Sequence, residues 1–432
     1  MSGSRLNAVN TIETSASRKF RWRVLLPLVL LIVMSSLDRV NISFAALQMN
    51  EDIGLTPQMY GIAVGAFFVG YLLCQFPSTW LLTRFGARRW ITGCVTLWGL
   101  VATAMAFVRT AEELYLLRFL LGCAESGFAP GVVYYCSGWM PARYRANTIA
   151  ITMLAIPISV IVGGPLCGWL MGANNPLDVA GWRWMLLMEG AATVVFGLAS
   201  YFVFADKPSD ARWLGAAEQA WIETELAREQ THAKAPESSP LSAALRDGRA
   251  WLAAGVWCTT LIGANGMMFW LPQAIKEVSQ SGELIIGMLA ALPWVGVACG
   301  MIGNSWHSDR TQERYWHVGV ALVLAMSALS VASVASGATA LLLLFLGGLG
   351  LGAAQGVFWS IPTSFLHRSV AAAGITLINL VGNLGSLAGP YMIGVIRAHS
   401  ESFAAPIWFV AAVLGGGALL LARLHASHRR VA

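Results

Sequence analysis

The stretch Ser35-Ser36-Leu37-Asp38-Arg39-Val40-Asn41 places a carboxylate and a guanidinium deep inside an apolar run that extends from about residue 22 to residue 47. This run is long enough to cross a bilayer, because a transmembrane helix needs roughly 20 mostly apolar residues. A charged side chain at the bilayer centre costs about 2.5–3.5 kcal/mol on insertion scales. Asp38 and Arg39 must therefore face protein, water or a ligand, either as a structural ion pair between helices or as part of a site for a charged solute and a proton.

The composition of the whole chain is typical of a polytopic membrane protein. Of its 432 residues 56% are hydrophobic and 12% are charged, whereas soluble domains have about 25% charged residues. The net charge of +6 arises from basic residues in short loops, so we expect a lipid bilayer and no nucleic acid as partner. Twelve transmembrane helices are predicted, at approximately residues 22–47, 59–83, 88–108, 112–138, 146–171, 183–205, 250–275, 283–305, 315–336, 338–362, 370–396 and 404–425.

The distribution of Lys and Arg predicts that both termini are cytoplasmic. With this orientation sixteen of the 28 basic residues fall in short cytoplasmic segments, and four fall in outer loops and helix mouths. Short cytoplasmic loops carry such an excess in membrane proteins. We therefore expect a multi-pass protein of the plasma (inner) membrane.

The domain organisation follows from the same runs. Residues 1–21 lack the apolar core and cleavage site of a signal peptide and are interpreted as a disordered cytoplasmic tail. A six-helix bundle is expected at 22–205, a cytoplasmic linker at 206–249, and a second six-helix bundle with a short cytoplasmic tail at 250–432. Within the linker, the stretch Ala216–Arg228 has the pattern of an amphipathic helix.

Weak internal similarity indicates that the two bundles are duplicated. Gly164-Pro165 and Gly389-Pro390 are 225 residues apart, and Arg84 and Arg310 are 226 residues apart. Duplicated halves with a site at their interface are typical of secondary transporters that work by alternating access.

Several other function classes are disfavoured. The sequence contains no Gly-Lys pair and hence no P-loop lysine, which argues against an ATP-driven pump. No His/Asp/Glu cluster has metal-ligand spacing, no nucleophile motif stands out, and the seven cysteines fall in predicted helices without a CxxC pair, so we expect neither an enzyme nor a metal site. A receptor would carry a substantial signalling domain, and none is visible in the sequence.

Three stretches resemble the major facilitator superfamily: Leu37–Asn41, Arg84–Arg89, and Arg118–Gly127. Within that superfamily the chain is similar to the anion:cation symporter family, which includes tartrate, galactonate, glucarate and phthalate carriers. The resemblance implies twelve helices in two pseudo-symmetric six-helix bundles. It also implies proton-coupled uptake of a small organic carboxylate (a sugar acid, a tartrate-like acid or an aromatic acid) by a functional monomer without a cofactor. A proton-driven exporter or antiporter is the main alternative.

Four charges are expected to converge in the central cavity of that fold. Arg118 and Glu125 are two helical turns apart, on one face and about 10 Å apart along the axis, and the family fold brings their helix beside that of Asp38 and Arg39. Arg39 would bind the substrate carboxylate, because its planar fork suits a bidentate contact. Asp38 and Glu125 would carry protons, and Arg118 would switch partners between them, unless it is a permanent brace.

Neutral side chains would then recognise the remainder of the substrate. The resemblance favours Tyr71, Trp359, Ser360 and Asn379 as substrate-binding residues, although Tyr71 has the alternative of an ordinary packing aromatic. Asn265 and Asn383 are further candidates, with interhelical hydrogen bonds as the alternative. Glu189, near the outer end of its predicted helix, is interpreted as structural.

The loops after the second and eighth helices carry a predicted conformational latch formed by Arg84, Asp309 and Arg310. The superfamily signature has an acid just before the arginine. The second half keeps it as Asp309, whereas Thr83 replaces it in the first half. Asp309 would brace a neighbouring helix end in one of two conformations, with a solvated surface acid as the alternative.

Overall fold

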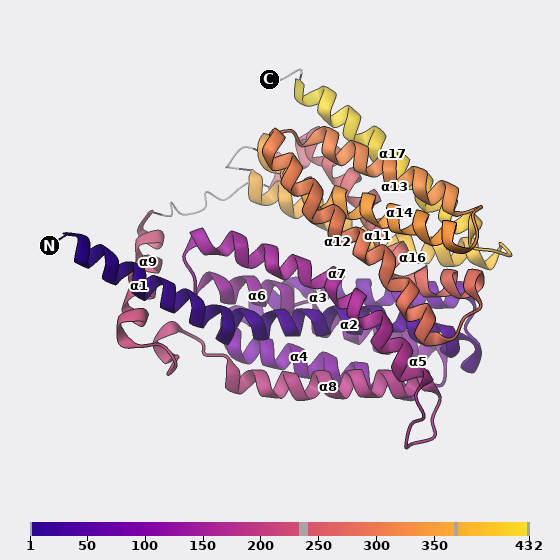
Figure 1. The fold of residues 1–432 in the computed structure, drawn as a ribbon, viewed down its shortest axis with the longest axis horizontal. Coiled ribbons are helices and arrows are strands. Elements are labelled where there is room, and N and C mark those ends of the chain that lie inside the picture. Colours follow the sequence, from indigo (N-terminus) through magenta and orange to yellow (C-terminus); the bar gives the residue numbers. More distant parts are fainter. Residues whose placement is uncertain (1, 233–240, 367–369, 430–432) are drawn as a thin grey trace.

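The computed structural model describes residues 2–232, 241–366 and 370–429 and consists of long helices in two groups that lie side by side (Figure 1). The first group contains α1 Ser2–Phe20, a π-helical turn Arg21–Leu25, α2 Leu26–Asp52, α3 Pro57–Phe85, α4 Ala87–Ala104, a short 3-10 turn Met105–Phe107, α5 Ala111–Glu125, α6 Phe128–Ser137, α7 Ala142–Gly172 and α8 Gly181–Val203. The connection contains a 3-10 turn Pro208–Asp210, α9 Ala216–His232 and α10 Leu241–Arg246. The second group contains α11 Gly248–Ser279, α12 Glu283–Thr311, α13 Tyr315–Ala332, α14 Gly337–Phe358, α15 Pro362–Phe365, α16 Ala371–Ala398 and α17 Ala404–Arg429.

The predicted all-α membrane fold is confirmed. Among the described residues, 11 helical segments are long and apolar enough to cross a membrane, with α5 and α6 forming one of them. The remaining long helix, α16, has 28 residues and carries Asn379, Asn383 and Ser386 within its apolar sequence. At this length α16 can also cross a bilayer, as predicted for residues 370–396.

Two segments differ from the expectations. The N-terminal residues form helix α1, which continues through the π-helical turn into α2 and projects beyond the bundle (Figure 1). The prediction of a disordered tail is therefore wrong for the residues that the structure describes. The central connection contains α9 at the position of the predicted amphipathic helix, and residues 233–240 of the linker lie outside the described part of the chain.

The helix predicted at 112–138 is broken where α5 ends at Glu125. Ser126 and Gly127 separate α5 from α6, and Ser126 Oγ lies 2.7 Å from Ser78 Oγ of α3. Gly127 O accepts a hydrogen bond from Trp90 Nε1 at 3.1 Å, and a Cβ at Gly127 would lie 2.6 Å from Trp90 Cζ2. Close packing against Trp90 thus requires glycine at the break and holds the carboxyl-terminal end of α5 in place.

Local signals determine other helix ends. Thr56 Oγ1 accepts from Met59 N at 3.2 Å and caps α3, which starts with Pro57. Gly86, with φ 80°, separates α3 from α4 and adopts a conformation that side chains other than glycine rarely allow. These tight connections place α2, α3 and α4 antiparallel to their neighbours in the first half.

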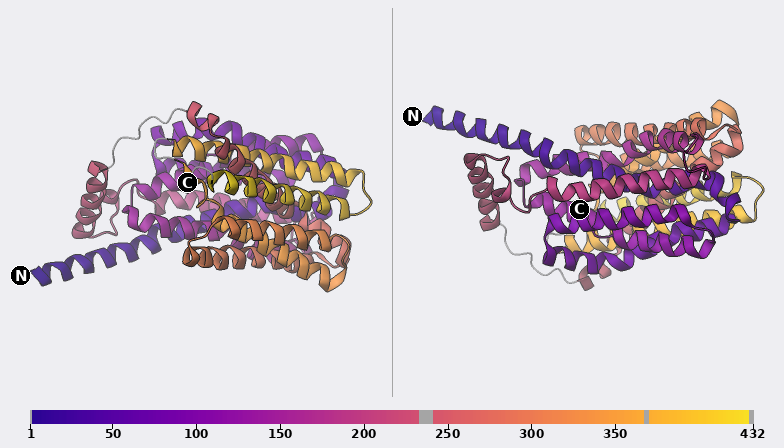
Figure 2. Two further views of the ribbon diagram at one scale, coloured as in Figure 1. Left: turned by 90° about the horizontal axis from the view of Figure 1, so that it is seen from above. Right: turned by 90° about the horizontal axis from the view of Figure 1, so that it is seen from below.

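The two halves meet at the end of the bundle that is remote from the chain termini, which we call the far end; the end that carries both termini is the terminal end (Figure 1). At the far end Tyr60 Oη donates to Phe269 O at 2.9 Å, and Lys276 Nζ donates to Leu47 O at 2.7 Å. Gln48 Nε2 also donates to Glu283 Oε1 at 3.0 Å. These contacts close the structure at the far end. Toward the terminal end the helices of the two halves diverge (Figure 1), and α1 projects beyond them (Figure 2).

The duplicated Gly-Pro pairs lie at equivalent contacts between the halves. On α7, a Cβ at Gly164 would lie 2.6 Å from Gly287 O of α12. On α3, a Cβ at Gly61 would lie 3.1 Å from Pro390 O of α16. Gly61 and Gly287 are 226 residues apart, which matches the repeat offset and explains why small residues occur where backbones approach this closely.

Candidate functional site

A buried ion pair joins α2 to α5. Arg39 Nε lies 2.6 Å from Glu125 Oε2, and Ser35 Oγ donates to the same oxygen at 3.1 Å. The Glu125 side chain is fully buried, whereas the Arg39 side chain is 29% exposed. Solvent or a solute can therefore reach this pair only at the Arg39 side chain.

Arg118 lies next to this pair without joining it. Its guanidinium carbon is 5.0 Å from the centroid of the Phe67 ring, and that of Arg39 is 5.3 Å from the same ring and 5.2 Å from the Tyr71 ring. Arg118 is fully buried and its Nε is 3.5 Å from Ala63 O. Its two terminal nitrogens have no hydrogen-bond partner among the described residues, and neither does Glu125 Oε1. Arg39, Arg118 and Tyr71 thus all lie around the Phe67 ring.

Asp38 faces a different part of the bundle from Arg39. Its Oδ2 accepts hydrogen bonds from Trp98 Nε1 at 3.1 Å and from Thr193 Oγ1 at 2.9 Å, so its partners lie on α4 and α8. Successive residues of a helix point about 100° apart, which explains why adjacent Asp38 and Arg39 diverge. Asp38 therefore makes its hydrogen bonds away from the Arg39–Glu125 pair in this conformation, while Glu125 remains an electrostatic neighbour of it.

Glu189, interpreted above as structural, lies beside Asp38. It is 7% exposed, its Oε1 accepts from Cys167 Sγ at 3.2 Å, and it is an electrostatic neighbour of Asp38. The sequence contained one signal for it: an acid in an apolar run costs as much at residue 189 as at residue 38. Its position near the end of the predicted helix suggested an interfacial anchor instead.

The residues predicted in the second half are neutral polar or aromatic side chains, which lie on α16 and directly after α14. The Trp359 and Trp257 rings have centroids 5.1 Å apart, and Trp257 stacks on Phe358 at 4.8 Å. Asn379 is exposed, and its backbone oxygen accepts from Asn383 Nδ2 at 2.9 Å. Ser360, partly exposed, follows Trp359 directly after the end of α14.

The alternative of an interhelical hydrogen bond is confirmed for Asn265. Its Nδ2 donates to Ser386 Oγ of α16 at 3.1 Å, and also to Leu261 O at 3.0 Å. Asn383 instead bonds within its own helix. Of the three amides, only Asn265 thus has a hydrogen bond to another helix among the described residues.

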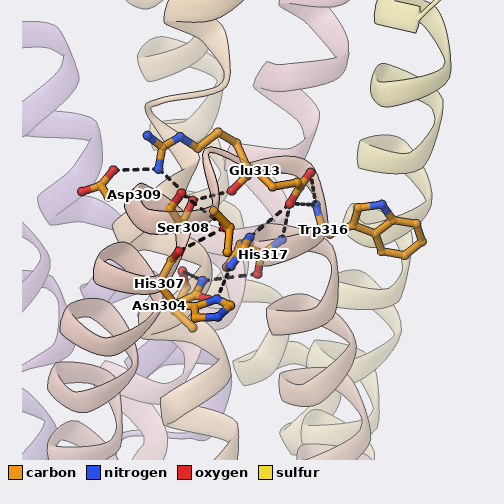
Figure 3. Close-up of polar contacts among 10 residues, drawn as sticks. Asn304, His307, Ser308, Asp309, Glu313, Trp316 and His317 are labelled. Carbon is orange, nitrogen blue, oxygen red and sulfur yellow. Dashed lines mark hydrogen bonds and ion pairs between the residues drawn. The ribbon is translucent and has the colours of Figure 1, made fainter.

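The predicted latch residues lie at the terminal end. Asp309 Oδ1 is 2.7 Å from Arg314 Nη1, at the residue that precedes α13 (Figure 3). Arg310 packs over the Trp306 ring at 4.1 Å, and Arg84 lies 5.6 Å from the Trp80 ring. Asp309 therefore contacts a neighbouring helix start in this conformation, while each latch arginine packs against an aromatic ring in its own helix.

A cluster with two histidines packs beneath the Asp309–Arg314 contact. His307 Nδ1 and His317 Nε2 are 2.7 Å apart, and His317 Nδ1 is 3.1 Å from Glu313 Oε2 (Figure 3). Partial burial acts to raise the pKa of Glu313, but hydrogen bonds from Trp316 N and from His317 outweigh it and hold that pKa below its ordinary value. These contacts tie the end of α12 to the start of α13.

Comparison with known proteins agrees with this architecture. The family model for the Major Facilitator Superfamily matches residues 28–390. A protein from Agrobacterium vitis named "Putative tartrate transporter" is 43% identical over 404 residues, which cover 93% of each protein. A "Quinolone resistance transporter" from Acinetobacter baumannii is 33% identical over 420 residues, 97% of this chain and 96% of that protein.

The fold also matches a solved structure. A bacterial homologue of the human lysosomal transporter Spinster, in an inward-facing and occupied conformation, matches with a TM-score of 0.76 at 18% identity, covering 94% of this chain and 97% of that chain. The family and these relatives are membrane transporters, which confirms the expectation that the chain is not an enzyme. The chain is a multi-pass membrane transporter that belongs to the Major Facilitator Superfamily.

Proposed function

We propose that this transporter imports a small organic carboxylate together with protons, by alternating access. The substrate class is a sugar acid, a tartrate-like acid or an aromatic acid, the proton is the coupling ion, and the unit is a monomer in the plasma membrane without a cofactor. The observation that carries this proposal is the Arg39–Glu125 pair, in which a fully buried carboxylate holds a partly exposed guanidinium. The relative named for tartrate supports an organic acid as substrate.

Arg39 is suited to exchange one carboxylate for another. In this conformation Glu125 occupies its Nε at 2.6 Å. A substrate carboxylate that approaches the exposed side of Arg39 competes with Glu125, and a proton on Glu125 removes that competitor. Substrate and proton therefore favour each other's binding, which is the linkage that a symporter needs.

Arg118 provides the second partner for Glu125. A buried guanidinium without a hydrogen-bonded anion is costly, and Glu125 Oε1 is itself without a partner among the described residues. When Arg39 turns to the substrate, Glu125 either takes up a proton or shifts toward Arg118. Arg118 thus couples the two events as the predicted switch.

The remaining residues complete recognition when the halves close. Tyr71 lies against Arg39 and would border the substrate on the first half. Trp359, Ser360 and Asn379 would present aromatic, hydroxyl and amide groups from the second half, which suit the uncharged part of such an acid. Arg84, Asp309 and Arg310 would exchange contacts as the terminal end opens and closes.

The orientation of the cycle follows from the charge distribution. With both termini in the cytoplasm, as the Lys and Arg distribution predicts, the diverging end of this structure faces the cytoplasm. The structure then represents the state that releases an imported substrate.

Proton-driven export is the second candidate, favoured by the relative named for quinolone resistance. Both functions can be tested in proteoliposomes by recording currents with tartrate, galactonate, glucarate and phthalate, with and without a pH gradient and in the absence of sodium. We expect a sodium-independent current with one acid that increases on outside acidification. Proton-driven movement of only cationic or neutral drugs would show an exporter.

A further inference from the structure

We propose that Asp38 and Glu189 form a second proton-binding site within the first half, separate from the Arg39–Glu125 pair. The inference rests on the proposed proton-coupled transport and extends it to Glu189 and helix α8. In this site the two carboxyl groups share a proton that is taken up and released during each transport cycle.

The two carboxyl groups belong to one buried polar cluster between four helices. Thr193 Oγ1 of α8 lies 2.9 Å from Asp38 Oδ2 and 3.0 Å from the backbone oxygen of Glu189, one turn earlier on the same helix. Trp98 of α4 donates to Asp38, and Cys167 of α7 donates to Glu189. Each carboxyl group is thus positioned by neutral donors rather than by a cation.

One oxygen of each carboxyl group is left without a partner. Asp38 Oδ1 and Glu189 Oε2 are buried and make no hydrogen bond within the described residues. The Asn41 amide, fully buried and in interaction range of Glu189, is also without a hydrogen-bond partner at both its nitrogen and its oxygen. These are the positions that a proton on either carboxyl group would use, since a protonated carboxyl becomes a donor.

No basic group offsets these two acids. The groups facing them are Asn41 of α2, Trp98 of α4, Cys167 of α7, Thr193 of α8 and, at longer range, Glu125 of α5. In the part of the chain that the structure describes, neither acid has an ion pair, while the nearby Arg39 contacts Glu125. Two ionised carboxylates without a cation in the membrane interior would repel each other and lack solvation. The pair therefore needs a proton to remain buried.

Helix α2 links this pair to the substrate site. It carries Asp38 and Arg39 at adjacent positions, and its Ser35 donates to Glu125. Loss of the proton from the Asp38–Glu189 pair adds a negative charge next to Arg39 and opposes binding of an anion there. By reciprocity, a bound anion favours retention of the proton, so this pair adds a coupled proton to the one assigned to Glu125.

The test is the number of protons moved per substrate in proteoliposomes, measured for the wild type and for Glu189→Gln. If the variant moves one proton fewer, its maximal accumulation falls by about tenfold for each unit of pH gradient. Substrate counterflow, which moves no net proton, should lose part of its pH dependence. Glu112→Gln, which removes an exposed acid at the start of α5, is the matched control and should behave as the wild type.

The outcomes separate the two proposals. If the wild type shows no proton-driven accumulation, the proposed symport fails. If the wild type is coupled and Glu189→Gln keeps the same proton stoichiometry and pH profile, the second site is overturned.

If the Glu189→Gln variant does not insert into the membrane, infrared spectroscopy of carboxyl groups provides a second test. We expect a protonated-carboxyl carbonyl band at neutral pH in both the wild type and Glu125→Gln, and a shifted band in Glu189→Asp. Absence of that band from Glu125→Gln would overturn the Asp38–Glu189 site, because it would assign the protonated carboxyl to Glu125.

Discussion

The two halves of the molecule share a repeated architecture but differ in what they bury. Among the described residues, the buried charged side chains of the spanning helices are Asp38, Arg118, Glu125 and Glu189, and all belong to the first half. The repeat mates of Arg118 and Glu125 are Leu343 and Gly350, and the second half presents Trp359, Ser360 and Asn379 instead. From this difference we propose that proton and charge chemistry belong to the first half and that the second half recognises the uncharged part of the substrate.

The largest effect is expected from Arg39→Ala, which removes the partly exposed guanidinium of the Arg39–Glu125 pair. A hydrogen bond to a charged group contributes about 1.5–3 kcal/mol, so loss of a bidentate contact should weaken carboxylate binding by about 100-fold. It also leaves Glu125 buried without its partner, so the melting temperature should fall as well. Binding and melting temperature can be measured in detergent by titration with the transported acid.

Two controls define that result. Arg39→Lys keeps the charge but loses the planar fork and should bind with intermediate affinity. Arg109→Ala removes an exposed arginine and should leave binding unchanged. If Arg39→Ala binds the acid as tightly as the wild type, the anion site lies elsewhere.

Glu125→Gln tests whether the first half couples proton movement to substrate movement. The amide cannot take up a proton and is a weaker competitor for Arg39, so the variant should move one proton fewer per substrate, and its maximal accumulation should fall by about tenfold for each unit of pH gradient. The proton on the Asp38–Glu189 pair should still drive the accumulation that remains. Counterflow at saturating substrate should continue and become less dependent on pH. Accumulation at the wild-type level in this variant would remove Glu125 from the coupling mechanism.

Trp359→Ala, in the second half, should weaken substrate affinity without changing proton coupling. Loss of an aromatic contact costs about 1 kcal/mol, so we expect about a fivefold rise in KM for the acid and no change in protons per substrate. Trp359→Phe keeps the ring contact with Trp257 and should remain near the wild type. Trp408→Ala, which removes a half-exposed tryptophan of α17, is the matched control. A change in stoichiometry with Trp359→Ala would break the division of labour between the halves.

The sequence was sufficient for the features that depend on single segments. The apolar runs identified the membrane helices, and the motif around Arg39 together with Arg118 and Glu125 identified the residues around Phe67. The amphipathic pattern of Ala216–Arg228 correctly indicated α9. Each of these signals lies within one run of residues.

Features that depend on how helices face one another could not be predicted. The direction of Asp38 is set by the rotation of α2 relative to α4 and α8, which places Trp98 and Thr193 against it. The same packing of α2 against α8 places Glu189 beside Asp38, and no pattern within one helix indicates this. The break after Glu125 depends on Trp90, 35 residues earlier in the chain, and no single-segment pattern reveals that contact.

The smallest effect is expected from an ion pair outside the membrane. Lys19 Nζ of α1 lies 2.7 Å from Glu218 Oε2 of α9, with Lys19 37% exposed. Burial acts to raise the pKa of Glu218, but hydrogen bonds from Lys19, Ser15 Oγ and Gly215 N outweigh it and leave that pKa below its ordinary value. A depressed pKa means that the contact stabilises α9 above the ordinary pKa of glutamate, about 4.3, and that this stabilisation is lost as the pH falls through the lower value.

Lys19→Gln should therefore destabilise the α1–α9 contact by only about 0.2–1 kcal/mol, compared with about 3–5 kcal/mol when one partner of a buried pair such as Arg39–Glu125 is removed. Hydrogen exchange of α9 at neutral pH should rise slightly in this variant, while transport continues at the wild-type rate. Added salt should reproduce the rise in the wild type, because exposed ion pairs are screened. A transport defect as large as that of Arg39→Ala would show that α1 and α9 take part in the cycle, and that burial alone does not rank the ion pairs of this molecule.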